Sequence, residues 1–473
     1  MANPSPRSGL SPSAIDELRS LLGADAVVTD PDRLASAEVD WTGRFRGSTP
    51  VLLRPRTTDD VSAALAWCNR SRVAVVPQGG NTGLVGGGVP LHGEVVLGLG
   101  RLDAVGPVDL LAGQVTAGAG ATLAAVQAAA AEHGLLYPVD LAARDQATVG
   151  GMVATDAGGV HLLRWGGTRR QLMGVEAVLA DGRVVSHLGG LEKDNTGYDL
   201  AQLVCGSEGT LAVVTAARLR LVPAPRDVAV ALLAFAGVHD AVAAVAALRR
   251  RLPGLQAAEL VVAAGVDLVC QAFDRRQPFA ARWPVLVLVE VASSIEGEAT
   301  GSGPSVERLA YSVARLDAVR DSAVADDAAG RAELWSYRED HTLAINTLGP
   351  PHKLDVTLPP AELARFLADV PGRVQTVAPD AAVWLFGHVA DGNIHVNVTS
   401  VLDDEIGPQV DDAVLAMVAE RGGSISAEHG IGTAKRHWLH LNRSPAEIEV
   451  FRQIKAALDP NGILNPHVLL PER

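Results

Sequence analysis

Two histidines and an asparagine fall within one short apolar segment, GHVADGNIHVNV, from Gly387 to Val398. Asp391-Gly392 is a favoured pair for a two-residue type I′ turn. A hairpin closed by this turn pairs His388 directly with His395, and cross-strand Cβ atoms about 4.5–5.5 Å apart let both imidazoles bind one ion. Asn397 lies on the same face because side chains alternate along a strand. Two such histidines can equally be ordinary core or surface residues.

A second polar cluster, SAEHGIGTAKR from Ser426 to Arg436, supplies a carboxylate and a further histidine. Glu428 would complete a set of two histidines and one carboxylate with positions left open for water or substrate. Such a set suits zinc or another divalent ion. His429, its neighbour, would project differently and remain available for proton transfer near neutral pH.

A third cluster lies between Trp335 and Pro359. Arg338 and Thr342 are four residues apart, so on a helix they share a face. Arginine suits bidentate recognition of a carboxylate, and Lys353 would add a point charge. The alternative for the arginine is a solvated helical surface.

The chain that must position these residues has 473 residues, of which 48% are hydrophobic and 20% charged. This length predicts two domains of roughly 200 to 250 residues. A formal charge of −14 argues against a general nucleic-acid binder, which needs a basic face. The three cysteines show no CxxC spacing, so neither a disulfide framework nor a thiolate metal site is indicated.

The N-terminal segment lacks the apolar core of a secretory signal. No run approaches the ~18 apolar residues that a spanning helix needs. We therefore expect a soluble protein that does not span a membrane and resides in the cytoplasm.

Three loops of small residues fall within the first half of the chain. The first, PQGGNTGLVGGGVP from Pro77 to Pro90, follows a strand–helix–strand pattern over residues 51–77. The next segment, GEVVLGL, is strand-like, which disfavours a nicotinamide-binding fingerprint. Similar loops occur at 139–159 and 203–223. Glycines let a backbone approach a ligand closely, so three such loops indicate one extended ligand.

In this order, PQGGNTGLVGG, TVGGMVATDAGG, KDNTGYDL and GSEGTLAVVT resemble the FAD-binding domain of the vanillyl-alcohol oxidase and p-cresol methylhydroxylase (PCMH) flavoproteins. Within this superfamily the chain most resembles the D-2-hydroxyglutarate dehydrogenases, from Asp40 to LDPNGILNP. The resemblance implies an α+β fold with a two-subdomain PCMH-type FAD-binding domain over 1–225. A ferredoxin-like α+β cap domain follows over 226–473, and its C-terminal tail returns to the flavin. The strand–helix alternation after 226 suggests a sheet with helices on one face.

The same resemblance implies a set of FAD contacts. The first loop would hold the pyrophosphate, Glu208 and Gly209 would lie near the adenine half, and Asn465 would return towards the flavin. No histidine occurs in the first loop, so the FAD is expected to be non-covalent. The full set is Gly79, Gly80, Asn81, Thr82, Gly83, Thr148, Gly150, Gly151, Thr155, Glu208, Gly209 and Asn465.

For the reaction, the resemblance implies oxidation of a D-2-hydroxy acid, with D-2-hydroxyglutarate preferred, to the 2-oxo acid by hydride transfer to flavin N5. His388, His395 and Glu428 would bind zinc, or else manganese or iron, and His429 would be the general base. The substrate's carboxylate would contact Arg338, Thr342, Lys353 and Asn397. An electron-transfer flavoprotein or a quinone is the expected acceptor, and a homodimer is a possible assembly.

Other functions remain open at this point. The substrate could be D-lactate or glycolate within the same fold. An alkyl-dihydroxyacetone-phosphate synthase-like transferase would share the flavin fold without net oxidation, and a non-catalytic flavin subunit would need neither metal nor base. The two-histidine segment together with Glu428 and His429 favours the dehydrogenase over the last two.

Overall fold

The computed structural model describes residues 9–293, 304–400 and 405–472. The chain forms two compact units. Unit 1 comprises Met1–Gly159, Gly166–Pro223 and Glu428–Arg473, and unit 2 comprises Val160–Trp165 and Ala224–Ala427. The last segment of the chain therefore belongs to unit 1, although it follows unit 2 in the sequence.

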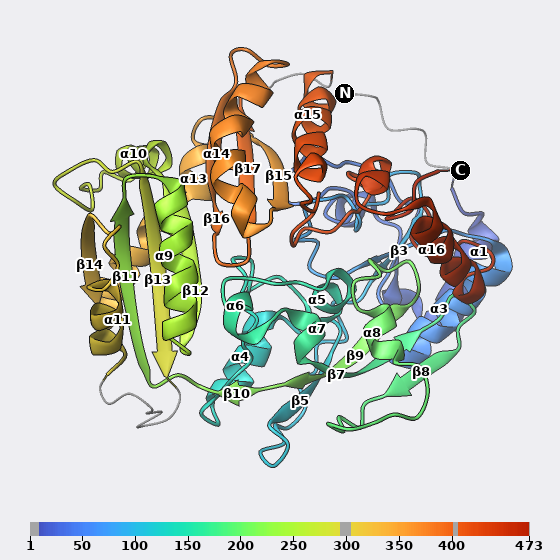
Figure 1. The fold of residues 1–473 in the computed structure, drawn as a ribbon. Helices are drawn as coiled ribbons and strands as arrows, with labels where there is room; N and C mark the ends of the chain where they lie inside the picture. The colour runs from blue at the N-terminus through green and yellow to red at the C-terminus, as the bar shows by residue number, and fades with distance from the viewer. Residues whose placement is uncertain (1–8, 294–303, 401–404, 473) are drawn as a thin grey trace. The chain divides into compact units, whose positions relative to one another are not determined.

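The first sheet of unit 1 has the strand order β1-β2-β4-β3, with β2 and β3 parallel to β4. Helix α3 connects β2 to β3 and begins with a capping box, in which Thr57 and Asp60 bind each other's backbone N–H. Helix α1 packs against α3 (Figure 1). The elements are α1 (Pro12–Leu22), η1 (Ala24–Ala26), β1 (Val27–Val28), α2 (Pro31–Leu34), β2 (Leu52–Leu53), α3 (Thr58–Ser71), β3 (Val75–Gln78) and β4 (Val95–Gly98).

The second sheet of unit 1 is antiparallel, in the order β5-β9-β7-β8, and β6 pairs separately with β10. Both larger sheets and the C-terminal Leu464 share one apolar core. The remaining elements of this unit are β5 (Gln114–Gly118), α4 (Leu123–Ala131), β6 (Leu135–Leu136), α5 (Val149–Thr155), α7 (Thr168–Gln171), β7 (Leu172–Val178), β8 (Val184–His187), α8 (Leu200–Val204), β9 (Val213–Arg220), β10 (Val222–Pro223), η2 (Arg436–Leu441) and α16 (Pro445–Leu458).

Unit 2 is built on a seven-stranded antiparallel sheet in the order β14-β11-β13-β12-β16-β17-β15. Its strands are β11 (Asp227–Phe235), β12 (Leu255–Val262), β13 (Val285–Ser293), β14 (Asp321–Ala325), β15 (His352–Thr357), β16 (Ala382–His388) and β17 (Asn393–Thr399). Its helices are α6 (Leu162–Trp165), α9 (Val238–Arg251), α10 (Ala263–Ala272), α11 (Ser305–Val313), α12 (Ala328–Glu339), α13 (His341–Asn346), α14 (Pro360–Gln375) and α15 (Ile406–Glu420).

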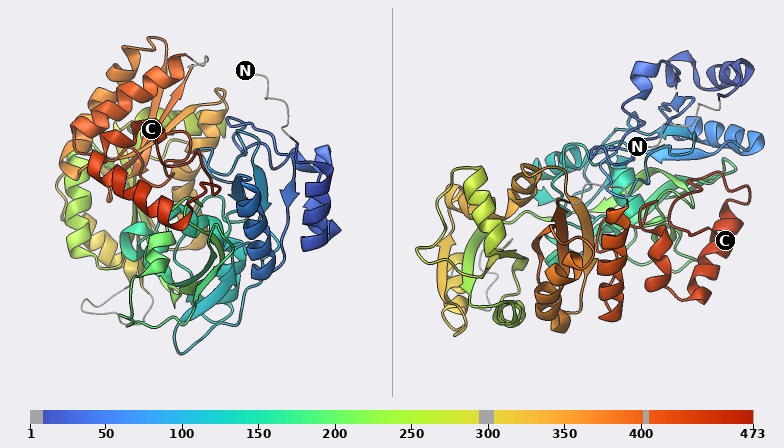
Figure 2. Two further views of the ribbon diagram at one scale, coloured as in Figure 1. Left: turned by 90° about the vertical axis from the view of Figure 1, so that its right-hand side faces the viewer. Right: turned by 90° about the horizontal axis from the view of Figure 1, so that it is seen from above.

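Helices cover both faces of this sheet, so the prediction of helices on one face is wrong. Residues of α10, α12 and α13 share an apolar cluster with Leu286 and Leu288 of β13. The alternate residues Val287 and Val289 are also fully buried, and α9 and α11 pack against the same strand. A nearly continuous apolar run is typical of a strand buried on two sides, and VLVLVEVA is such a run. Figure 2 shows α14 and α15 next to each other.

One face of the sheet changes character across its width. Val230, Leu232 and Leu288 make it apolar over β11 and much of β13, although Glu290 also lies on it. Over β17 and β15 it carries polar residues, and Glu259 of β12 and His388 of β16 lie between the two regions. Strand register places Glu259 opposite His388, Asp355 opposite His395 and Lys353 opposite Asn397. Within the described residues, no helix is long and apolar enough to cross a membrane.

Candidate active site

A cavity in unit 1 brings together the three small-residue loops. It is lined by every residue predicted to contact FAD, from Gly79 in the first loop to Asn465 near the C-terminus. His429, the predicted base, is part of the same wall. The structure thus collects these residues around one cavity, and their contact with FAD stays a prediction.

Two glycines of the first loop, Gly79 and Gly80, are required by close packing between two of these loops. A Cβ atom on Gly80 would overlap the carbonyl oxygen of Gln146, and one on Gly79 would overlap Thr148. Gly83, by contrast, faces open space. Asn81 has a positive φ of 54°, which asparagine tolerates better than most residues. Small side chains here leave bare backbone along the cavity, which fits a ligand with phosphate oxygens.

Glu208 and Asn465 hold parts of the wall together. The Glu208 carboxylate accepts the backbone N–H groups of Ile431 at 2.8 Å and Gly432 at 2.6 Å. Burial raises the pKa of Glu208, while these two N–H groups and the charge of Lys435 act in the opposite direction. The Asn465 side chain donates to the carbonyl oxygens of Gly87 and Glu208. Glu208 therefore ties the wall to the segment that follows His429, and Asn465 ties Glu208 to the first loop.

The hairpin that carries the predicted metal ligands has a longer loop than expected. Strand β16 ends at His388 and strand β17 begins at Asn393, so the loop between them has four residues. In the paired strands, His395 lies opposite Phe386. The predicted pairing of His388 with His395 is wrong by a shift of two residues. An even shift keeps both on one face. Their ring centroids lie 5.5 Å apart.

His388 is bound to a buried carboxylate that the sequence analysis missed. Its Nδ1 lies 2.5 Å from Glu259 Oε1, and Arg338 Nε donates to Glu259 Oε2 at 2.7 Å. Burial would raise the pKa of Glu259, but the charges and hydrogen bonds of His388 and Arg338 outweigh it and lower the pKa to about 2. A lone acid in the apolar run LQAAELVV was the available signal, because buried acids are rare unless paired.

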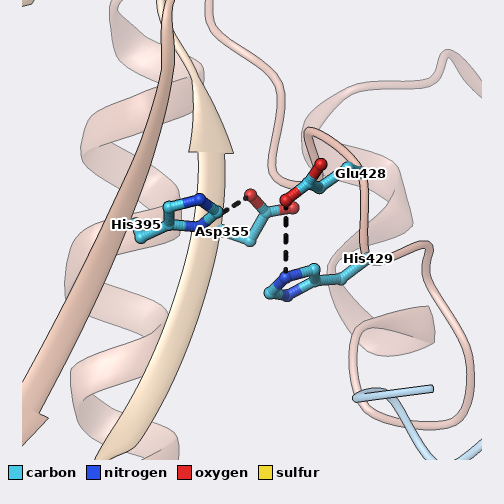
Figure 3. A group of neighbouring side chains, drawn as sticks. All are labelled: Asp355, His395, Glu428 and His429. Atoms are coloured by element: carbon cyan, nitrogen blue, oxygen red, sulfur yellow. Dashed lines mark ion pairs between the residues drawn. The ribbon is translucent and has the colours of Figure 1, made fainter. Parts of the chain in front are cut away.

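His395 has a similar neighbour. Its Nδ1 lies 3.6 Å from Asp355 Oδ1 (Figure 3), and Asp355 also accepts the Asn393 side-chain amide at 2.7 Å. The other carboxylate oxygen of Asp355 accepts the N–H of Ala427 at 3.0 Å. Glu428 follows Ala427 directly in the chain, and its Oε1 lies 4.0 Å from His429 Nε2 (Figure 3). Asp355 was also missed by the sequence analysis.

The predicted substrate contacts come from four elements of unit 2, namely α12, α13, β15 and β17. Arg338 lies in the last turn of α12 and Thr342 lies in α13. The helix is interrupted at Asp340, so the single helix predicted for these two residues is in fact two helices. Lys353 and Asn397 are cross-strand partners. Burial lowers the pKa of Lys353. The Asn397 Nδ2 group is buried with no hydrogen-bond partner among the described residues, which fits a polar ligand at this point.

Comparisons with known proteins decide the family. The family model described as "FAD linked oxidases, C-terminal domain" matches residues 224–469, which is more than half of the chain, and "FAD binding domain" matches 49–187. The chain belongs to the FAD-linked oxidases. It is therefore an FAD-linked oxidoreductase, and the predicted fold class, a PCMH-type FAD-binding domain followed by an α+β cap domain, is confirmed.

Curated relatives of this chain match it over more than four fifths of their own lengths. D-2-hydroxyglutarate dehydrogenase, mitochondrial, of Danio rerio is 37% identical over 100% of this chain and 89% of its own. The protein of the same name in Bos taurus is 39% identical, and the match covers 94% of this chain and 81% of that protein. The protein of that name in Arabidopsis thaliana is 34% identical, and the match covers 98% of this chain and 82% of that protein. The solved structure of 4-ethylphenol oxidase from Gulosibacter chungangensis has a TM-score of 0.75 at 19% identity, covering 99% of this chain and 100% of that one.

These relatives contradict one expectation. The prediction of a cytoplasmic location is wrong by this comparison, because the relatives from Danio, Bos and Arabidopsis are named as mitochondrial proteins. The prediction rested on the absence of an apolar secretory core. Mitochondrial targeting segments are amphipathic and rich in arginine and serine, so such an absence does not bear on them.

Substitution of Gly80 tests the packing of the flavin cavity. We expect Gly80→Ala to weaken contact between the first two loops, because the added Cβ overlaps the Gln146 carbonyl. The flavin-free variant should unfold at a lower temperature, by a few degrees for each lost kcal/mol, and should retain little FAD on purification. Gly83→Ala is the control, since its Cβ enters open space and should leave the flavin-free melting temperature unchanged. Equal melting temperatures for both variants would contradict the packing argument.

Substitution of Glu208 tests its hold on the segment after His429. In Glu208→Gln only one side-chain atom accepts a hydrogen bond, so one of the N–H groups of Ile431 and Gly432 loses its partner. We expect FAD to be retained while flavin reduction slows at least about tenfold, because small displacements of a reacting group are costly. Stopped-flow reduction under saturating substrate measures this. Glu472→Gln, an exposed carboxylate of the same unit, is the control. A wild-type rate in Glu208→Gln would rule out this role.

Proposed function

We propose that the chain oxidises a D-2-hydroxy acid, with D-2-hydroxyglutarate as the preferred substrate, to the 2-oxo acid. The main support is the cavity of unit 1, which has His429 in the same wall as the predicted flavin contacts. The names of relatives that are 34% to 39% identical over nearly the whole chain support the substrate. When bound, FAD supplies the acceptor, flavin N5, for the hydride from the substrate's α-carbon.

The FAD would be held without a covalent bond. The first loop, residues 77–90, contains no histidine. The backbone of Gly79 to Gly83 would contact the pyrophosphate, and the chain between Thr148 and Thr155 would lie further along the cofactor. Acid precipitation of the protein should accordingly release its flavin.

His388, His395 and Glu428 would hold a divalent ion, with zinc preferred over manganese or iron. Their nitrogen and oxygen donors suit zinc, and a carboxylate lies beside Nδ1 of each histidine, as is common for metal-binding imidazoles. Glu428 directly follows Ala427, whose N–H is bound to Asp355 beside His395. When bound, the ion supplies positive charge that lowers the pKa of the substrate's hydroxyl group.

The chain's own residues would then do two things. His429 Nε2 or Nδ1 would take the hydroxyl proton as the hydride leaves. Arg338, Thr342, Lys353 and Asn397 would bind and orient the carboxylate, with Arg338 fixed through its Nε by Glu259. An electron-transfer flavoprotein or a quinone would reoxidise the flavin, and the active form could be a homodimer.

Anaerobic bleaching of the flavin absorbance near ~450 nm tests the proposal. D- and L-2-hydroxy acids are added one at a time to FAD-loaded protein, with and without a chelator. We expect D-2-hydroxyglutarate to bleach the flavin fastest and the chelator to slow it strongly. Preference for D-lactate would favour the activity for which a Schizosaccharomyces pombe relative, 34% identical, is named. No bleaching by any hydroxy acid in metal-replete protein would contradict the dehydrogenase and favour a transferase.

Replacement of His429 tests the general base. We expect His429→Ala to lower the rate of flavin reduction by about 10²–10⁴-fold, the usual contribution of a positioned base. FAD content should stay at the wild-type value. His440→Ala is a matched control, because His440 is exposed in the same unit and belongs to the helix η2 that follows. A wild-type reduction rate in His429→Ala would exclude the proposed role.

A further inference from the structure

Glu259 of β12 is a fully enclosed acid near the proposed site. Its exposed fraction is 0%, and both carboxylate oxygens are used: Oε1 binds His388 Nδ1 at 2.5 Å and Oε2 accepts Arg338 Nε at 2.7 Å. An ionised carboxylate at such depth is costly unless paired. The two partners are the first proposed metal ligand and the first proposed substrate contact, and all three residues belong to unit 2.

The bond to His388 fixes which ring nitrogen can bind a metal. Glu259 and His388 are direct cross-strand partners on β12 and β16, so strand register sets the pair. A carboxylate at Nδ1 keeps the ring proton on that nitrogen. The lone pair of the neutral ring then lies on Nε2, the nitrogen that would face an ion.

The bond to Arg338 fixes the guanidinium in the same way. Arg338 comes from the last turn of α12, and its guanidinium carbon lies 4.6 Å from the centroid of the Phe386 ring. With Nε committed to Glu259 and one side against this ring, the guanidinium has a restricted orientation. Its remaining N–H groups are those suited to a substrate carboxylate.

We propose that Glu259 is a positioning residue that orients the metal-binding histidine and the substrate-binding arginine at the same time. This inference rests on the proposed function and extends it, because one carboxylate couples metal affinity to substrate affinity. Glutamine cannot replace it, because both partners are donors and an amide has a single acceptor atom. One of the two partners must therefore face the amide NH2 group.

Glu290 provides a matched control. It lies on β13, the strand next to β12, on the same face of the sheet, and only 8% of it is exposed. Trp335, also from α12, donates to it at 2.8 Å, and Gln256 donates at 2.6 Å. Glu290→Gln thus removes a buried charge beneath the same helix without removing a partner of His388 or Arg338.

The experiment compares Glu259→Gln, Glu290→Gln and wild-type protein, all FAD-loaded. Zinc per chain is measured by mass spectrometry after equilibration against a graded chelator, and KM is measured for D-2-hydroxyglutarate. We expect zinc affinity to fall about 10–100-fold in Glu259→Gln, KM to rise, and flavin content to stay unchanged. In Glu290→Gln we expect a lower melting temperature with wild-type zinc affinity and KM.

Three outcomes would overturn the inference. Wild-type zinc affinity and KM in a folded Glu259→Gln protein would show that Glu259 positions neither partner. An equal loss of zinc in Glu290→Gln would assign the effect to the stability of the sheet. A wild-type chain that binds no divalent metal and reduces its flavin with no hydroxy acid would overturn the proposed function itself, and the inference with it.

Discussion

Buried carboxylates on one face of the unit 2 sheet determine where the surrounding elements lie. Glu259 and Asp355 are fully buried and Glu290 nearly so. A buried ionised carboxylate is tolerated only when donors surround it. These donors come from α12, from the β16–β17 hairpin and from the backbone that leads to Glu428. Each element is thereby held by a polar contact of defined geometry, which apolar packing alone would not supply.

The short segment 428–430, which carries the proposed ligand and base, is anchored at both ends. Before it, the N–H of Ala427 is bound to Asp355 within unit 2. After it, the N–H groups of Ile431 and Gly432 are bound to Glu208 within unit 1. Backbone donors to carboxylates are charge-assisted and stronger than neutral hydrogen bonds. Each anchor therefore fixes the chain at one end of the segment within its own unit.

The sequence predicted what local pattern determines and missed what distant pairing determines. The glycine loops, the strand–helix–strand pattern over residues 51–77 and the fold class follow from short motifs in order. The hairpin register did not, because His388 O accepts the N–H of both Asp391 and Gly392 and so lengthens the turn. The predicted face of the sheet was nevertheless right for both histidines, because side chains alternate with a period of two and the register was shifted by two residues. Glu259 could not be paired with His388 from sequence, because 129 residues separate them.

In the cavity of unit 1, too, short motifs predicted which residues line the wall but did not predict which contacts their side chains make. Motif resemblance assigned Glu208 and Asn465 to the cofactor, and both do line the cavity. The Glu208 carboxylate, however, accepts the N–H groups of Ile431 and Gly432, and the Asn465 amide donates to the carbonyl oxygens of Gly87 and Glu208. Glu208 therefore lines the cavity and also holds the backbone just after His429. The position of the proposed base, His429, therefore depends on a residue of the cavity wall that lies in another loop.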